Sequence, residues 1–237
     1  MARRSLVIVL IAICAACKPA AKKPASPDAR PQVRATVVTI RTTIQPENKT
    51  FTHALVIGKD RARFLGERDA WRLFDTNAKR VTFVNDATKT TRTESLDAIL
   101  GSRRKTLANT LPAHYPRATV KRGERRPILE VNAEQLLIEA GAWRRELWFA
   151  EHRAIPDALF MMMHASDPPS SPLAPMMSAA EDALLRAKGF PLLDRSEIAY
   201  GKTTRVVERT VLSIVQRNVP ASVLEVPKGY RDTTPPT

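Results

Sequence analysis

Histidines and carboxylates are the first residues to consider for chemistry in this chain of 237 residues. The four histidines are His53, His114, His152 and His164. No two of them have the i,i+4 or short-loop spacing that places two imidazoles on one metal ion. Glu146 and Glu151 flank Trp148 and could form an acid/base pair, although carboxylates on a solvated strand are common. Because no nucleophile elbow, phosphate loop or dinucleotide fingerprint accompanies them, we expect a non-enzymatic protein without a metal or cofactor.

The two cysteines, Cys14 and Cys17, both lie within the first 17 residues. A positive start and an apolar stretch over 5–13 precede them, which is too short to span a bilayer and is typical of a secretory signal. Cys17 follows Ala15 and Ala16, as the acylated cysteine does in a bacterial lipobox. We therefore predict a signal peptide over 1–16 and lipid attachment at Cys17, with an ordinary signal peptide as the alternative. A later disulfide or cysteine-ligated metal is excluded.

The stretch after Cys17 has the composition of a tether. Residues 18–32 are rich in proline, alanine and lysine and lack large apolar side chains, so they cannot bury a core. We assign 17–32 to a lipidated cysteine and tether that lies near anionic headgroups or serves as a plain spacer. This predicts an exported protein of the bacterial cell envelope, anchored to a membrane. Lys18, in place of aspartate, points to the outer membrane and a domain that faces the periplasm.

Charge and aromatic content limit the partners. Lysine and arginine outnumber aspartate and glutamate by 38 to 24, a formal net charge of +14, while hydrophobic residues make up 43% of the chain. This is globular composition, so wholesale disorder is excluded. Basic residues gather at 103–105, 121–126 and 144–145, but aromatic residues are only 5%, and we expect no nucleic-acid partner. The clusters form a solvated basic face or attract anionic headgroups or another acidic envelope polymer.

Alternation with a period near two predicts strands with turns every 8–12 residues, and hence an antiparallel meander. The expected strands are 34–44, 52–58, 61–66, 70–75, 80–85, 89–94, 118–123, 126–132, 134–140, 143–151, 196–204, 204–217 and 222–226. Over 133–140 the composition also suits a helix. Helices are expected after Ser95 as N-cap, over 158–165 with Pro156 as the first helical residue, and over 176–188 with Ser178 and Glu181 as a capping box.

The C-terminal third contains motifs that resemble a known family. They are Leu147-Trp148-Phe149-Ala150-Glu151, Lys188-Gly189-Phe190-Pro191-Leu192 and Val226-Pro227-Lys228-Gly229-Tyr230. In these motifs the chain resembles an uncharacterised bacterial family of exported lipoprotein domains related to the periplasmic lipoprotein carrier and the outer-membrane lipoprotein receptor. That family would place a glycine soon after Ile128, where this chain has Leu129-Glu130-Val131.

The resemblance implies a mainly β (α+β) fold. Its sheet is antiparallel and strongly curved into an open half-barrel, with two or three short helices on or over the concave face. It implies one domain over 33–230, and we expect the tail 231–237 to be disordered. The related carriers hold acyl chains in the concavity. No catalytic residue is assigned in the family, so none is carried over.

Large apolar residues are the candidates for ligand binding. The strand residues expected on the concave face are Leu55, Ile57, Phe64, Trp71, Leu73 and Phe83. The candidate helix residues are Phe160, Met161, Met162 and Met163. A helix that is apolar on all sides needs cover, and flexible thioethers adapt to varied partners. This helix is a plug in the concave face, a movable lid over an acyl-binding cavity, or a partner interface.

Two functions remain open. The first is a membrane-anchored lipoprotein that binds lipid, or a lipidated or apolar partner, in the concavity. The alternative is an envelope structural or interaction protein that has a filled core and displays a basic surface.

Overall fold

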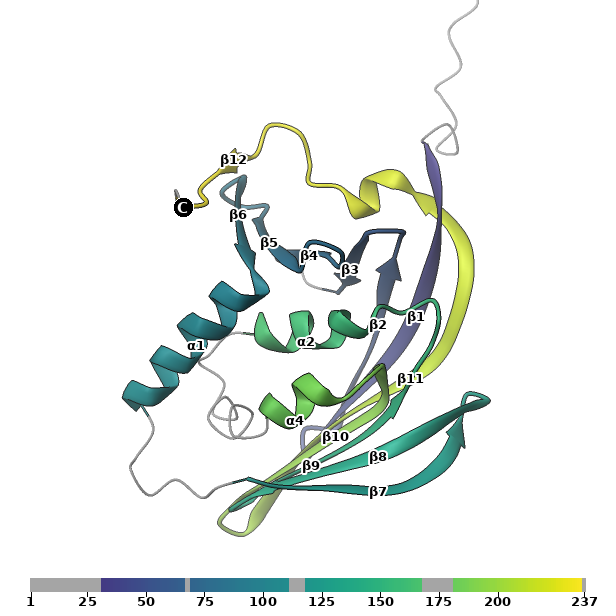
Figure 1. The fold of residues 1–237 in the computed structure, drawn as a ribbon, viewed down its shortest axis with the longest axis vertical. Helices are drawn as coiled ribbons and strands as arrows, with labels where there is room; N and C mark the ends of the chain where they lie inside the picture. The colour runs from purple at the N-terminus through teal and green to yellow at the C-terminus, as the bar shows by residue number, and fades with distance from the viewer. Residues whose placement is uncertain (1–30, 67–68, 111–117, 168–180, 236–237) are drawn as a thin grey trace, which may run out of the picture. The chain divides into compact units, whose positions relative to one another are not determined.

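Within residues 31–66, 69–110, 118–167 and 181–235, which the computed structural model describes, twelve strands form one sheet (Figure 1). The strands are β1 (Gln32–Gln45), β2 (Lys49–Ile57), β3 (Arg61–Leu65), β4 (Ala70–Asp75), β5 (Arg80–Asn85), β6 (Thr90–Ser95), β7 (Thr119–Ile128), β8 (Val131–Ala140), β9 (Trp143–Ala150), β10 (Phe190–Tyr200), β11 (Thr203–Pro220) and β12 (Arg231–Asp232). The helices are α1 (Leu96–Thr110), α2 (Asp157–Ala165), α4 (Glu181–Arg186) and the 3₁₀ helix η2 (Ala221–Leu224). The predicted signal peptide and Cys17 lie outside the described residues.

Most neighbours in the sheet are neighbours in sequence. Strands β1 to β6 pair in sequence order, and so do β7 to β11, in which α2 and α4 lie between β9 and β10. The two runs meet where β1 pairs with β11. Gln32 pairs with Pro220 and Gln45 with Val206. Each of these pairings is antiparallel, whereas the short β12 pairs in parallel with β6. The predicted meander is therefore confirmed.

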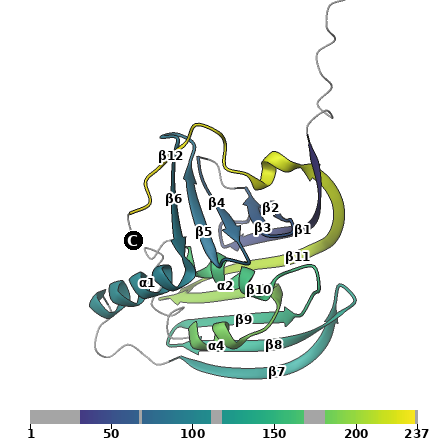
Figure 2. The same cartoon turned by 45° about the horizontal axis from the view of Figure 1, so that its top comes forward.

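The sheet is open and its helices share one side. Strands β12 and β7 lie at opposite ends of the strand order. Register shifts at Thr39/Ile40, Arg122/Arg125 and Pro191/Leu193 mark bulges, which bend strands and increase their twist. The sheet curves around α1, α2 and α4, which lie on its inner side (Figures 1 and 2). A mainly β fold with a large open sheet and a few helices is thus confirmed.

The helix starts follow local capping. Ser95 Oγ accepts a hydrogen bond from the backbone N–H of Ala98 at 3.1 Å, as predicted for an N-cap. Pro156 is the N-cap of α2, with extended backbone angles, and not its first helical residue. Helix α4 occupies 181–186 of the predicted 176–188. The proposed capping serine, Ser178, lies outside the described residues.

Two predictions for the C-terminal segment are wrong. The expected strand 222–226 is replaced by η2 between two prolines, because Leu224 packs beneath it with Val37 and Val56 on the outer side of the sheet. The tail is ordered in its described part, since Thr233 N–H donates to the carbonyl of Thr91 at 2.7 Å. The edge of β6 offers unpaired backbone groups, and hydrogen bonds to them order the tail, which has few apolar residues to bury.

Two expected strands contain turns. The strand predicted over 126–132 is interrupted, because Ile128 pairs with Val131 and the residues between them form a two-residue hairpin loop. The strand predicted over 196–204 ends at Tyr200, and Gly201 at φ +60° turns the chain into β11. The ambiguous segment 133–140 is a strand.

The loop between β7 and β8 has left-handed backbone without glycine. Leu129 has φ 49° and Glu130 has φ 63°. Two-residue loops of this kind favour Asn-Gly, because other side chains crowd the backbone there by about 1–2 kcal/mol per residue. This is also where the family resemblance would place a glycine.

We expect Leu129→Asn combined with Glu130→Gly to raise the free energy of unfolding by about 1 kcal/mol. The gain is smaller than the strain, because glycine also makes the unfolded chain more flexible. Urea unfolding would measure it. Glu139→Gly, within strand β8, is the control and should lower stability. A loss of stability in the loop variant would contradict the assigned turn.

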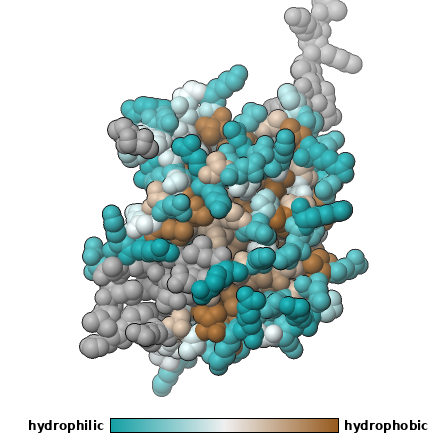
Figure 3. Space-filling view, viewed as in Figure 1, coloured by the Kyte–Doolittle hydropathy of each residue, from teal (hydrophilic) through white to brown (hydrophobic). Residues whose placement is uncertain are grey.

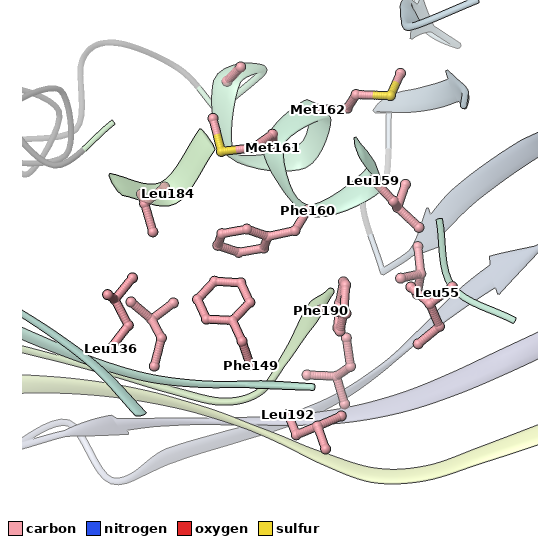
Figure 4. Packing of buried hydrophobic residues seen from close by; sticks show 14 of the residues in the cluster. Leu55, Leu136, Phe149, Leu159, Phe160, Met161, Met162, Leu184, Phe190 and Leu192 are labelled. Atoms are coloured by element: carbon pink, nitrogen blue, oxygen red, sulfur yellow. The ribbon is translucent and has the colours of Figure 1, made fainter. Parts of the chain in front are cut away.

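The core lies between α2 and the inner face of the sheet. Figure 4 shows Leu159 and Phe160 of α2 and Leu184 of α4 facing the strand residues Leu55, Leu136, Phe149, Phe190 and Leu192. Met161 and Met162, on other sides of α2, belong to the same core. All of these side chains are buried. Helix α2 therefore occupies most of the middle of the concavity.

Candidate functional site

The six strand residues predicted for the concave face divide between two clusters. Leu55, Ile57, Phe64 and Phe83 pack in the core that contains α2. Trp71 and Leu73 pack with Val84 in a separate cluster, so the prediction is wrong for these two. The cause is register: Ala62 pairs with both Ile57 and Phe74, which puts Phe74 and its alternate neighbour Arg72 on the core side. A ligand-binding role for the six residues stays a prediction.

The methionine-rich helix is mainly core. Met162 is fully buried, Met161 is 5% exposed and Phe160 is 8% exposed. The Phe160 ring meets the rings of Phe149 and Phe190 edge-on, at centroid distances of 5.3 and 6.3 Å. Of the three predicted lid methionines, Met163 is the one that is partly exposed. This burial agrees with the first of the three alternatives for α2, a helix that fills the concave face of the sheet.

A groove of about 920 Å³ lies between strands β7–β9 and helix α4. Its apolar lining consists of Val120, Val131, Leu136, Phe149, Ala183 and Ala187. Its charged lining consists of Arg122, Arg125, Glu134, Glu151, Arg186 and Lys188. On the face seen in Figure 3, hydrophobic residues likewise gather in patches that hydrophilic residues surround. We call the groove between β7–β9 and α4 the basic groove.

Electrostatics in the basic groove favours anions. Arg125 Nη2 and Arg122 Nη1 donate to the two carboxylate oxygens of Glu134 at 3.1 and 3.2 Å. The hydrogen bond from Arg125, together with the charge of Arg122, lowers the pKa of Glu134. The four cations that line the groove outnumber its two carboxylates. An apolar floor with excess positive charge suits an amphiphile with an anionic end.

A second, smaller hollow of about 130 Å³ lies between α2 and the inner side of the sheet. We call it the inner cavity. Its charged lining consists of Arg72, Arg145, Asp167, Asp194 and Arg209, and His164 adjoins them. Its apolar lining consists of Ile40, Phe64, Phe74, Phe160, Met163, Phe190, Pro191 and Val211.

A buried ion pair anchors the inner cavity. Arg145 Nε and Nη2 donate to the two oxygens of Asp194, both at 2.8 Å, and the two side chains are 3% and 6% exposed. Arg209 Nη1 donates to the same carboxylate at 3.3 Å from a half-exposed position. Burial alone would raise the pKa of Asp194, but Arg145 and Arg209 hold it below its usual value. Asp194 is therefore ionised near neutral pH.

His164 is buried beside this ion pair. Its ring stacks on Phe160 at 6.1 Å, and neither ring nitrogen has a hydrogen-bond partner among the described residues. Burial, and then the charges of Arg145 and Arg103, lower its pKa well below the usual value. The imidazole is therefore neutral in the folded protein.

We expect this histidine to make stability depend on pH. As pH falls below about 6.5, the unfolded chain gains a proton that folded His164 rejects, so folding weakens by up to about 1.4 kcal/mol per pH unit. Above about pH 7 the effect vanishes. His164→Leu should flatten the curve between pH 5 and 6.5 relative to wild type in urea unfolding. Curves that fall in parallel would contradict the assignment.

Arg103 is buried and joins two helices, although the sequence places it in a cluster of basic residues that was expected to be solvated. It is 5% exposed, and its Nη1 donates to the carbonyls of His164 and Ala165 at 2.8 and 3.3 Å. It therefore ties α1 to the C-terminal end of α2, where a cation is favourable. The cluster 144–145 behaves in the same way, because Arg145 is buried while Arg144 is exposed.

The carboxylates Glu146 and Glu151, which the sequence allowed as an acid/base pair but did not favour, have different surroundings. Glu146 Oε1 accepts hydrogen bonds from Gln135 Nε2 and Trp148 Nε1, both at 2.8 Å. Burial raises the pKa of Glu146, but these two bonds outweigh it and leave the pKa lowered, which is unsuited to a general acid. Glu151 is exposed and lines the basic groove instead.

The other histidines are dispersed. His53 lies between Phe51 and Phe64, and His152 Nδ1 accepts a hydrogen bond from the N–H of Ala154. His114 lies outside the described residues. In the part of the chain that the structure covers, no three histidine, cysteine or acidic side chains gather as a metal site would require. None of the described helices has both the length and the apolar character that a bilayer crossing requires.

Comparisons with known proteins give distant likenesses. No family model matches the chain, and no curated protein sequence matches it. Two crystal forms of PNGF-II are similar over 86% of this chain, with 11% identity and TM-scores of 0.46 and 0.44, and the chain spans about a third of PNGF-II (31% and 32%).

Two shorter proteins are similar over most of their length. One is a candidate outer membrane lipoprotein-sorting protein domain from Vibrio parahaemolyticus, with 10% identity, a TM-score of 0.27, and coverage of 77% of this chain and 85% of that one. The other is a LolA superfamily protein from Nitrosomonas europaea, with 10% identity, a TM-score of 0.26, and coverage of 83% and 91%. At these TM-scores, none of the likenesses assigns an activity to the chain.

Proposed function

We propose that this protein is a non-enzymatic binding module of the bacterial cell envelope. It holds an amphiphile with an anionic end, a lipid or the lipidated end of a partner protein, in the basic groove. The observation that carries the proposal is the combination of an apolar floor and a cationic rim in a hollow of about 920 Å³. Compared with the sequence prediction, the site moves from the middle of the concavity, which α2 fills, to its margin at β7–β9.

Size and chemistry of the basic groove support this proposal. Small-molecule sites typically measure about 300–1,000 Å³, and the basic groove lies within that range. Leu136 and Phe149 form part of the floor, and both belong to the well-packed core. Arg186 and Lys188 lie at the end of α4, next to that floor. An acyl chain on the floor would therefore place its anionic end near cations.

Uptake of a fluorescent fatty acid tests the floor. The Cys17→Ser variant, freed of bound lipid, should bind dansyl-undecanoic acid saturably. Val131→Glu puts a charge beside the apolar floor and should weaken binding about tenfold or more, since burying an unpaired carboxylate is costly. The matched control is Val215→Glu, at an exposed position of β11 that should leave binding unchanged. Absence of saturable binding in the protein with native Val131 would overturn the proposal.

Charge reversal tests the rim. Arg186→Glu combined with Lys188→Glu should weaken binding of the fatty acid more than binding of the matching fatty alcohol. The control is Arg217→Glu, on the exposed part of β11 and away from the groove. Equal losses of affinity for the acid and the alcohol would show that Arg186 and Lys188 do not recognise the charge of the ligand.

The second candidate is an envelope interaction protein with a filled core and a basic surface that attracts anionic headgroups or another acidic polymer. The full burial of Met162 and the packing of α2 favour it. The organic extract of the purified Cys17→Ser variant separates the two functions. Co-purified lipid, detected by mass spectrometry, supports the binding module, whereas lipid-free protein that fails to take up fatty acid supports the interaction protein.

We further propose that the mature chain begins at a diacylglycerol-modified Cys17 and attaches to the outer membrane, facing the periplasm. The proposal rests on the small residues before Cys17 and on Lys18 after it. Mass spectrometry should find acyl mass on the wild-type N-terminal peptide, and Cys17→Ala should release the protein from membranes in high salt. Wild-type protein without acyl mass would refute the anchor.

A further inference from the structure

The inner cavity is separate from the basic groove. Phe149 lines the groove and Phe160 lines the cavity, and their rings meet edge-to-face at 5.3 Å between centroids. This aromatic pair forms a wall between the two hollows. A ligand of the inner cavity would therefore be distinct from the amphiphile of the proposed function.

Charge in the lining of the inner cavity is unbalanced. Three arginines face two aspartates, while His164 is neutral. Arg145 already occupies both oxygens of Asp194, and Arg72 Nη1 bonds Asp167 at 3.0 Å. Arg209, whose Nη1 donates to Asp194 at 3.3 Å, shares that carboxylate with Arg145, so the three arginines of the lining exceed its two carboxylates by one charge. A single bound anion would balance the set.

Unpartnered nitrogens mark the same place. Arg145 Nη1 and both ring nitrogens of His164 are buried and have no hydrogen-bond partner among the described residues. Buried polar atoms are nearly always hydrogen-bonded to protein, ligand or ordered water, and leaving one unpaired lowers stability. Arg145 Nη1 and one ring nitrogen of neutral His164 are hydrogen-bond donors, so an acceptor beside them, such as an anion, would satisfy them.

The rest of the lining of the inner cavity is apolar, and the cavity is small. The rings of Phe64, Phe74, Phe160 and Phe190 line the cavity together with Met163 and Val211. An apolar cavity of about 150 Å³ holds one benzene molecule. The inner cavity, at about 130 Å³, is close to that volume. It therefore suits an apolar group of about the size of benzene, and it is too small for a whole acyl chain.

We propose that the inner cavity binds a small monocarboxylate, either aromatic or short-chain aliphatic, with its anion beside Arg145, His164 and Arg209. Its apolar body lies among the phenylalanine rings. The proposal is independent of the basic groove, because the two hollows share no lining residue.

Calorimetric titration of the purified Cys17→Ser protein with benzoate and with benzyl alcohol tests the proposal. Benzoate should bind at least about tenfold more tightly than its neutral analogue, since a charge-assisted pair contributes about 1.5–3 kcal/mol. Arg209→Gln should remove most of that preference and leave the fold intact, because its side chain is 52% exposed and Asp194 keeps Arg145. Arg217→Gln, on the same strand, is the control and should change nothing.

The location is read separately, by NMR of ¹³C-methyl methionine. Benzoate should shift the methyl signal of Met163, which lines the cavity, more than that of Met162, which does not. Equal affinity for benzoate and benzyl alcohol, or an unmoved Met163 signal, would overturn the proposal. So would benzoate binding that disappears in the Arg186→Glu, Lys188→Glu variant, since that result would place the anion in the basic groove. Hexanoate should also shift the Met163 signal, whereas palmitate, which the basic groove can take, should not. A Met163 shift with palmitate as large as that with hexanoate would contradict the size limit.

Discussion

Asp194→Ala is expected to lower the free energy of unfolding by about 3–5 kcal/mol, because it leaves Arg145 buried without its counter-ion. Both nitrogens that now bond Asp194 at 2.8 Å would lose their acceptor, in a site that water barely reaches. Urea unfolding measures the loss. Since the pKa of Asp194 is lowered, its contribution is complete above the unfolded value near 4 and disappears as the pH falls further.

Two controls separate the buried pair from charge in general. Glu47→Ala removes a partner of Arg205 in an exposed ion pair and should lower stability far less than Asp194→Ala does, because solvent screens exposed pairs. Arg145→Met combined with Asp194→Leu removes both buried charges and should restore stability to within about 1 kcal/mol of wild type, or exceed it. An Asp194→Ala protein as stable as the Glu47→Ala protein would contradict the buried geometry.

Met162→Ala is expected to cost about 2–5 kcal/mol, because a fully buried side chain leaves a cavity that its neighbours fill only in part. If α2 fills the core, Met162→Ala should lower the stability of the protein without a matching change in uptake of dansyl-undecanoic acid. Met162 does not line the basic groove. Thermal unfolding and fatty-acid binding, measured on the same protein, give both quantities.

The neighbouring residue provides the comparison. Met163 is partly exposed, so Met163→Ala should cost clearly less than Met162→Ala. A movable lid would give the opposite pattern, with little loss of stability in either variant and a marked change in fatty-acid uptake in both. That pattern would restore the lid interpretation of α2.

Local alternation was sufficient to predict most strands of this fold. The predicted bounds 70–75 and 80–85 match β4 and β5 because alternation and turn residues are both properties of neighbouring positions. The face of a strand is different. Whether Trp71 or Arg72 faces the helices depends on how β4 pairs with β3, which periodicity does not contain. Backbone bonding to β6 ordered the tail in the same non-local way.

The candidate sites were harder to predict than the strands. The groove and the inner cavity combine residues far apart in sequence, and Arg145 meets Asp194 across 49 positions. Basic runs such as 103–105 look solvated when partners are unknown, yet Arg103 is buried. A signal did exist: Asp194 follows Phe190-Pro191-Leu192-Leu193, and a lone acid after an apolar run must either reach water or find a cation.

The pairing of β1 with β11 also constrains when the sheet can form. Gln45 meets Val206, so the central seam of the sheet joins segments separated by most of the domain. Contacts of such long sequence separation slow folding, since the loop must close before they contribute. During synthesis the hairpins β1–β6 would keep an unpaired edge on β1 until β11 is available. The chain would thus stay incompletely folded, and dependent on protection from edge-to-edge association, until nearly all of it has been made.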